Sequence, residues 1–306
     1  MPGSLVGVVI RRRLEPTVPP TTAPIRVDLP TRLAHLPSGV VEHRFERRGD
    51  EAVLVLHGGH LRAGFALGED VFADGRHSVL VPSRPGYGRT PLSTGATPDG
   101  FADSARELCE HLGITRLAAV VGVSAGGPTA LALAARHPDL VARVVLWSAV
   151  GALPWPDRRT RLAARAAFSP ATERLVWTAL RGLLRVSPDA GLRSLLGDLS
   201  TLPAGRVLAA LSAEQRAALV ALFGRMRSGA GFRNDLVSFP DRVPPVGQPA
   251  LVVASRRDGS VPFAHAEALV AALPRAELLE SRADSHFVWL GPDWGEVGAA
   301  VREFAR

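Results

Sequence analysis

The segment Gly122-Val123-Ser124-Ala125-Gly126 places a serine among small residues. An apolar run over 117–123 leads into it, and an alanine-rich pattern with helical spacing over 125–136 leads out. A serine at a sharp strand-to-helix turn takes a strained backbone conformation, and side chains at 122 and 126 would collide with the passing chain. We therefore predict a nucleophile elbow with Ser124 as the nucleophile. A serine that only caps the helix is the alternative.

A serine hydroxyl is a weak nucleophile at neutral pH, so it needs a nearby base and an acid that orients this base. In an open α/β sheet such groups lie in loops after the carboxyl ends of the strands. Asp258 follows an apolar strand pattern over 250–255, and His286 lies between the last short strand and the last helix. We predict Asp258 as the acid and His286 as the base, in the chain order Ser, Asp, His. For Asp258, an ordinary turn aspartate before a glycine is the alternative.

The attacked carbonyl also needs backbone N–H donors where negative charge develops. Ala125 supplies one N–H at the start of its helix, where the helix dipole is favourable. The second donor is expected in His57-Gly58-Gly59-His60, which follows a β-rich run over 52–56. We predict the N–H of Gly59, with that of His60 as the alternative, and we interpret His57 as a structural brace for this loop.

The elements that position these residues alternate between strands and helices. Strands are predicted over 40–47, 52–56, 78–81, 117–123 and 141–147, with helices over 101–112 and 125–136. After a break, the alternation resumes with a strand over 250–255, a helix over 262–273, a strand over 276–279 and a helix over 292–304. This order predicts an α/β fold with a mostly parallel central sheet and helices on both of its faces.

Between 151 and 245 the alternation stops. Amphipathic helices are predicted there instead, over 159–168, 172–184, 192–199, 205–211 and 212–227. This stretch is much longer than a crossover helix needs, so we predict an inserted helical cap, or lid, over 151–245. The α/β core then comprises 38–150 and 246–306, and a proline-rich irregular arm covers 1–37.

With these motifs in order, the chain resembles the α/β-hydrolase superfamily from about Val40 to Phe304. The matching segments are His57-Gly58-Gly59, Arg84-Pro85-Gly86-Tyr87-Gly88-Arg89-Thr90, Gly122-Val123-Ser124-Ala125-Gly126-Gly127, Arg136-His137-Pro138, Asp258 with Val261-Pro262, and Ser285-His286-Phe287. The resemblance implies the α/β-hydrolase fold, the triad of Ser124, Asp258 and His286, and oxyanion donors at Gly59 and Ala125. It also implies that the helical insertion is a lid over the pocket.

Two departures leave the subfamily open, since Val123 stands where many members have histidine and Ser285 where many have glycine. A serine at the elbow disfavours the aspartate-dependent haloalkane dehalogenases and epoxide hydrolases. The predicted function is a serine hydrolase that cleaves a small or medium acyl compound, an ester, thioester or lactone, through a covalent acyl-enzyme. The alternatives are an acyltransferase or perhydrolase, a carbon–carbon bond hydrolase, and a non-catalytic ligand-binding member of the fold.

The composition and residue spacing of the chain limit the kinds of partner and ligand that are predicted. The net charge is +7, but every basic residue is an arginine and the arginines are dispersed without interleaved aromatics, so nucleic-acid binding is not predicted. No apolar run reaches the length of a membrane span. No histidine, cysteine or carboxylate cluster has metal-ligand spacing and no phosphate loop is present, so neither a metal nor a cofactor is predicted.

Cys109 is the only cysteine, so no internal disulfide is expected. The apolar run over 5–10 is short and precedes its arginines, which is the reverse of a secretory signal. These two features predict a cytoplasmic protein. The sequence leaves the oligomeric state open.

Overall fold

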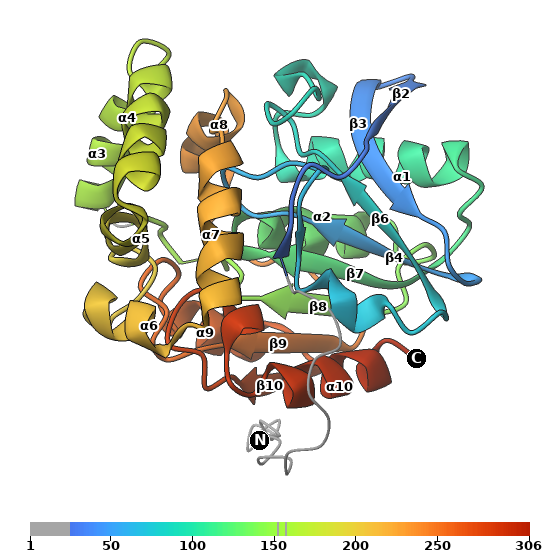
Figure 1. Ribbon diagram of the computed structural model, residues 1–306. Helices are drawn as coiled ribbons and strands as arrows, with labels where there is room; N and C mark the ends of the chain where they lie inside the picture. The colour runs from blue at the N-terminus through green and yellow to red at the C-terminus, as the bar shows by residue number, and fades with distance from the viewer. Residues whose placement is uncertain (1–24, 152, 157) are drawn as a thin grey trace.

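An eight-stranded sheet in the order β10-β9-β8-β7-β4-β6-β3-β2 forms the centre of the computed structural model, which describes residues 25–151, 153–156 and 158–306 (Figure 1). The six strands β10, β9, β8, β7, β4 and β6, in this spatial order, pair in parallel with their neighbours. Strand β3 pairs antiparallel with both β2 and β6. The sheet is therefore mostly parallel, as predicted. The strands of this sheet are β2 (Arg32–Leu36), β3 (Gly39–Glu46), β4 (Glu51–Leu56), β6 (His77–Pro82), β7 (Leu117–Val123), β8 (Val144–Trp147), β9 (Ala250–Ala254) and β10 (Ala276–Glu280).

Alternate residues of the central strands enter two hydrophobic cores, one on each face of the sheet. In β4, Leu54 and Leu56 face one core, called the first core here, whereas Val53 and Val55 face the second core. A strand buried on both faces is apolar without interruption, which explains the continuous apolar runs in the sequence. The first core is completed by α1 (Pro98–His111), α2 (Gly127–Arg136) and α9 (Ala264–Ala272). The second is completed by the short helix η1 (Glu69–Phe72), by α10 (Trp294–Phe304) and by apolar side chains from the segment 177–226.

Six helices described by the structure lie between β8 and β9. In Figure 1, α3 to α6 form a column to one side of the sheet, and α7 and α8 lie between this column and the sheet. Within the described part of 151–245 there is no strand of the main sheet, only helices and one isolated β-bridge at Ser200. The helices are α3 (Arg158–Ala167), α4 (Glu173–Val186), α5 (Pro188–Leu196), α6 (Ala204–Ala210), α7 (Ala213–Arg225) and α8 (Gly231–Ser238).

Helix α8 was not predicted from the sequence. It spans only eight residues, which is too short for a convincing periodic pattern. Its apolar contacts come from Phe232 and Leu236, one helical turn apart, which pack with Tyr87 in a small separate cluster. Tertiary packing therefore stabilises this helix.

The predicted irregular arm over 1–37 is wrong at 25–26 and 32–36, which form strands. Ile25–Arg26 forms β1, which pairs with β5 (Ala66–Leu67), and Arg32–Leu36 forms β2 at the edge of the main sheet. Prolines at 30 and 37 flank β2 without interrupting its ladder, and an edge strand tolerates them there. Residues 1–24 of the predicted arm lie outside the described residues. The division between core and cap stays a prediction.

Candidate active site

Ser124 lies directly after β7, where the chain turns into α2 through the short helix η3 (Ser124–Gly126). Its φ of +51° is in the left-handed region, which costs a residue with a Cβ about 1–3 kcal/mol. A Cβ at Gly126 would lie 2.1 Å from the carbonyl oxygen of Leu56, so the predicted steric need for glycine there is confirmed. The turn thus carries the backbone strain that a nucleophile elbow would have, between a strand and a helix.

Asp258 and His286 are brought together from loops after β9 and β10. Nδ1 of His286 and Oδ2 of Asp258 lie 2.7 Å apart. The other carboxylate oxygen, Oδ1, accepts the backbone N–H groups of Ser260 and Val261, both at 2.8 Å. Ser124, Asp258 and His286 are 7 %, 2 % and 5 % exposed, so all three side chains are shielded from bulk water.

The segment after β8 anchors both the serine and the histidine. The N–H of Val150 donates to the carbonyl oxygen of Ser124 at 2.9 Å, and the hydroxyl of Ser148 donates to the carbonyl oxygen of His286 at 2.9 Å. Ser148 itself has a φ of +44°. Two strained backbone positions, at 124 and 148, therefore lie at the ends of adjacent strands β7 and β8.

Residues 199–201, which precede α6, hold the loops that bear Asp258 and His286 in place. Leu199 accepts the backbone N–H of His286 at 2.7 Å and that of Gly259 at 3.3 Å. Ser200 forms a β-bridge with Asp258, and its hydroxyl donates to the carbonyl oxygen of Asp284 at 2.5 Å. The sequence carried no signal for this contact, because it joins the helical insertion to two core loops that are distant in the chain.

A Gly259→Ala substitution tests this contact. A Cβ at Gly259 would lie 2.7–2.8 Å from backbone atoms of Ser200, which cannot rotate away. We expect the free energy of unfolding to fall by about 1–3 kcal/mol and kcat to fall with it, because the loop that bears Asp258 must shift. Gly182→Ala in α4 is the control, since a Cβ there meets nothing within 4 Å and should slightly stabilise the helix. Chemical denaturation and kcat of both variants provide the comparison, and an unchanged Gly259→Ala protein would contradict the contact.

The loop after β4 lies beside Ser124. A Cβ at Gly58 would lie 3.6 Å from Oγ of Ser124, and a Cβ at Gly59 would lie 3.2 Å from the ring of Phe232. His57 is buried, and its Nδ1 lies 2.8 Å from the carbonyl oxygen of Gly58. Burial, and to a smaller extent the charge of Arg84, lowers the pKa of His57 to about 3. A neutral imidazole that bonds its own loop agrees with the interpretation of His57 as a brace.

Aromatic side chains of the insertion surround His60. The ring centroids of Phe168, Trp177 and Phe232 lie 4.9, 5.5 and 4.0 Å from the imidazole centroid. His60 has a φ of +63°, and its Nδ1 lies 2.8 Å from Oγ of Ser228. Burial, with a smaller contribution from Arg84, lowers its pKa to about 3. An apolar, aromatic surface thus lies next to the predicted oxyanion loop, which the periodicity of the insertion did not reveal.

The single thiol of the chain lies outside the loops that bear Ser124, Asp258 and His286. Cys109 is buried in α1, and burial raises the pKa of its thiol to about 12, so it is not a competing nucleophile. Among the described residues, no group of three or more His, Cys, Asp or Glu side chains has the arrangement of a metal site. No helix in the described ranges is long and apolar enough to cross a membrane.

Comparison with known proteins identifies the family of this chain. The protein-family model described as alpha/beta hydrolase fold matches residues 51–292, which is most of the chain. The chain belongs to the alpha/beta hydrolase family. This alpha/beta hydrolase is 30 % identical over 273 residues to the uncharacterized hydrolase YcgS of Bacillus subtilis, an alignment that covers 87 % of the chain and 95 % of the relative. Family membership and fold predicted from the motifs are therefore confirmed.

More specific names occur among other relatives of the alpha/beta hydrolase. A 2-hydroxy-6-oxononadienedioate/2-hydroxy-6-oxononatrienedioate hydrolase of Burkholderia vietnamiensis is 28 % identical over 248 residues, which cover 75 % of the chain and 78 % of the relative. Among solved structures, an alpha/beta hydrolase fold protein from Nakamurella multipartita has a TM-score of 0.72 at 25 % identity, and the match covers 90 % of this chain and 99 % of that one. An esterase from Thermogutta terrifontis has a TM-score of 0.60 at 19 % identity and covers 97 % of its own length and 90 % of this chain, a likeness of fold alone.

Proposed function

We propose that this alpha/beta hydrolase is a serine hydrolase that cleaves a small or medium acyl compound, such as an ester, thioester or lactone. The observation that carries the proposal is the buried Asp258–His286 hydrogen bond of 2.7 Å, with the second oxygen of Asp258 held by two backbone N–H groups. A carboxylate held in this way fixes the tautomer and the orientation of an imidazole. Such an arrangement serves a base that must take a proton from a neighbouring hydroxyl.

In the proposed mechanism, Ser124 attacks the acyl carbonyl carbon while Nε2 of His286 takes the hydroxyl proton. Asp258 keeps the proton of Nδ1 in place and stabilises the imidazolium that forms. The backbone N–H groups of Ala125 and Gly59 stabilise the oxyanion of the tetrahedral intermediate. His286 then protonates the leaving group. Water, activated by the same histidine, releases the acyl group and restores Ser124.

A carbon–carbon bond hydrolase is the second candidate. It is favoured by the relative from Burkholderia vietnamiensis, whose alignment spans three quarters of both chains. Both chemistries use a serine at the elbow, so the scissile bond depends on what contacts the substrate. Acyl transfer to another acceptor is supported more weakly. The match to L-serine/homoserine O-acetyltransferase of Streptomyces lavendulae covers only 19 % of the chain, and the match to a homoserine O-acetyltransferase of Haloferax gibbonsii covers 63 % of the chain but only 52 % of that relative.

A substrate screen tests the proposal. The panel combines p-nitrophenyl esters of graded chain length, thioesters, lactones and a 2-hydroxy-6-oxo dienoate, each assayed with wild-type protein and Ser124→Ala. We expect hydrolysis of at least one acyl substrate that the variant does not catalyse. Turnover of the dienoate without any ester would favour the second candidate, and product analysis with added alcohols would detect acyl transfer. No Ser124-dependent turnover of any substrate would contradict the proposal.

A further inference from the structure

Helix α8 of the insertion is joined to the core by a buried ion pair. Both Nη atoms of Arg84 donate to the carboxylate of Asp235, at 2.8 Å and 2.7 Å, and their side chains are 3 % and 4 % exposed. The hydroxyl of Tyr87 donates to the same carboxylate at 2.6 Å. Burial opposes the charge of Arg84, but Asp235 outweighs it and the pKa of Arg84 is raised. Because burying a charge pair costs much of what the pair gains, stability alone is a weak reason for it.

Arg84 in turn holds His57. Its Nε donates to the carbonyl oxygen of His57 at 2.8 Å, and its backbone N–H donates to Nε2 of the His57 ring at 2.9 Å. Since a backbone N–H only donates, Nε2 is the acceptor and the ring proton lies on Nδ1. Nδ1 therefore donates to the carbonyl oxygen of Gly58.

The hydrogen bond from Nδ1 of His57 orients the peptide group between Gly58 and Gly59. In a trans peptide the C=O and N–H bonds point in opposite directions, so a Gly58 carbonyl held towards His57 points the N–H of Gly59 away from it. The peptide lies beside the nucleophile, because a Cβ at Gly58 would lie 3.1 Å from Cβ of Ser124. An N–H donor that is fixed before the reaction stabilises the oxyanion without reorganisation.

We propose that Asp235 is a positioning residue that sets the oxyanion donor at Gly59 through Arg84 and His57. The inserted helix α8 thereby completes the reactive geometry of the core, and the chemical step requires α8 to be docked. A backbone hydrogen bond from Gly231 to the carbonyl oxygen of Gly86, at 3.1 Å, holds the start of α8 on the same loop. The inference rests on the proposed serine hydrolase function.

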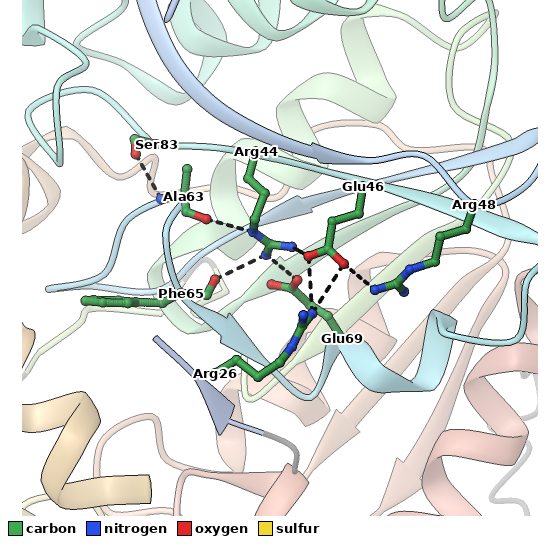
Figure 2. Close-up of polar contacts among 8 residues, drawn as sticks. All are labelled: Arg26, Arg44, Glu46, Arg48, Ala63, Phe65, Glu69 and Ser83. Atoms are coloured by element: carbon green, nitrogen blue, oxygen red, sulfur yellow. Dashed lines mark hydrogen bonds and ion pairs between the residues drawn. The ribbon is translucent and has the colours of Figure 1, made fainter. Parts of the chain in front are cut away.

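The test compares two buried ion pairs, one that joins Arg84 to α8 and one that joins β3 to η1. Asp235→Asn removes the charge that holds Arg84, and Glu69→Gln removes the charge that holds Arg44. The side chains of Glu69 and Arg44 are similarly buried, at 5 % and 3 % exposed. Figure 2 shows the control pair, in which Arg44 also contacts Glu46 and the carbonyl oxygens of Ala63 and Phe65. Both variants should lose thermal stability, whereas only Asp235→Asn should lose activity.

For Asp235→Asn we expect kcat and the rate of fluorophosphonate labelling to fall at least about 10-fold with KM changed less than 3-fold, short of the 10²–10³-fold loss on removing an oxyanion donor. Glu69→Gln should stay within about 2-fold of wild type in both rates, measured well below each Tm. An Asp235→Asn protein with wild-type rates, or an effect on KM alone, overturns the proposal. Equal loss of kcat in both variants does so too.

If Asp235→Asn does not fold, a double variant separates the positioning role of Asp235 from its contribution to the stability of the fold. Arg84→Met with Asp235→Leu replaces the ion pair by apolar side chains of similar size, a change that is often neutral for stability. We expect a folded protein with the same loss in kcat, because Nε of Arg84 no longer holds His57; wild-type kcat in this variant overturns the inference. Wild-type protein that the probe does not label would instead contradict the proposed function.

Discussion

Ser124→Ala is expected to abolish covalent labelling by a fluorophosphonate probe and to lower kcat on the order of 10⁶-fold, because the attacking oxygen is removed. The probe forms a bond to an activated serine, so labelling reports on Ser124 without knowledge of the substrate. Intact-protein mass spectrometry should show one added phosphonyl group on the wild-type protein and none on the variant. Persistent labelling of Ser124→Ala would place the nucleophile elsewhere.

Ser124→Gly is the informative companion variant. Alanine keeps a Cβ at the φ of +51°, whereas glycine adopts this conformation without steric cost. Both variants should be inactive, but the glycine variant should have the higher Tm, since relief of the strain outweighs the added freedom of the unfolded chain. A lower Tm for Ser124→Gly than for Ser124→Ala would indicate that the elbow stores little strain.

Asp258→Asn is expected to lower kcat about 10³–10⁴-fold while the protein stays folded. Oδ1 of Asp258 accepts two backbone N–H groups, so an asparagine must place its carbonyl oxygen there. Its amide NH₂ then faces Nδ1 of His286 in place of Oδ2. The histidine must accept with Nδ1 and carry its proton on Nε2, where it can no longer take the proton of Ser124. The loss is therefore in kcat, with KM nearly unchanged.

Asp284→Asn is the matched control for this prediction. Asp284 lies two residues before His286 and pairs with Arg257 at 3.0 Å, but its side chain is 31 % exposed. Removal of its charge should leave kcat within about 2-fold of wild type, because an exposed pair contributes little. Similar losses of activity in Asp258→Asn and Asp284→Asn would mean that local charge, rather than the tautomer of His286, determines the rate.

The chain order of the elements was predictable because each depends on short-range patterns. A strand buried on both faces must be apolar throughout, so β4, β7, β8 and β9 are visible as runs. Edge strand β2 has no such requirement, and three of its five residues are exposed, so it was missed beside prolines 30 and 37. Helix α8 was missed because eight residues held by tertiary contacts need no strong pattern of their own.

Ser124, Asp258 and His286 stood out in the sequence because strand ends and small residues mark the loops that present them. The distance between Asp258 and His286 was not available there, since the two residues are 28 positions apart in the chain, with a helix and a strand between them. Asp235 and Ser200 were missed for the same reason. Each acts on a core loop from a distant segment of the insertion, and an aspartate in a short helix has no spacing that predicts an arginine 151 residues earlier.

The sequence by itself determined the family, the order of the buried strands and longer core helices, and the residues that could form a triad, because backbone strain at a turn and burial of strands restrict residue types locally. Only the tertiary structure decided how the insertion meets these residues. It placed Phe232 against Gly59, Ser200 against Asp258 and Asp235 against Arg84. These contacts depend on the packing of helices around the sheet, and packing is set by the whole chain rather than by any one segment.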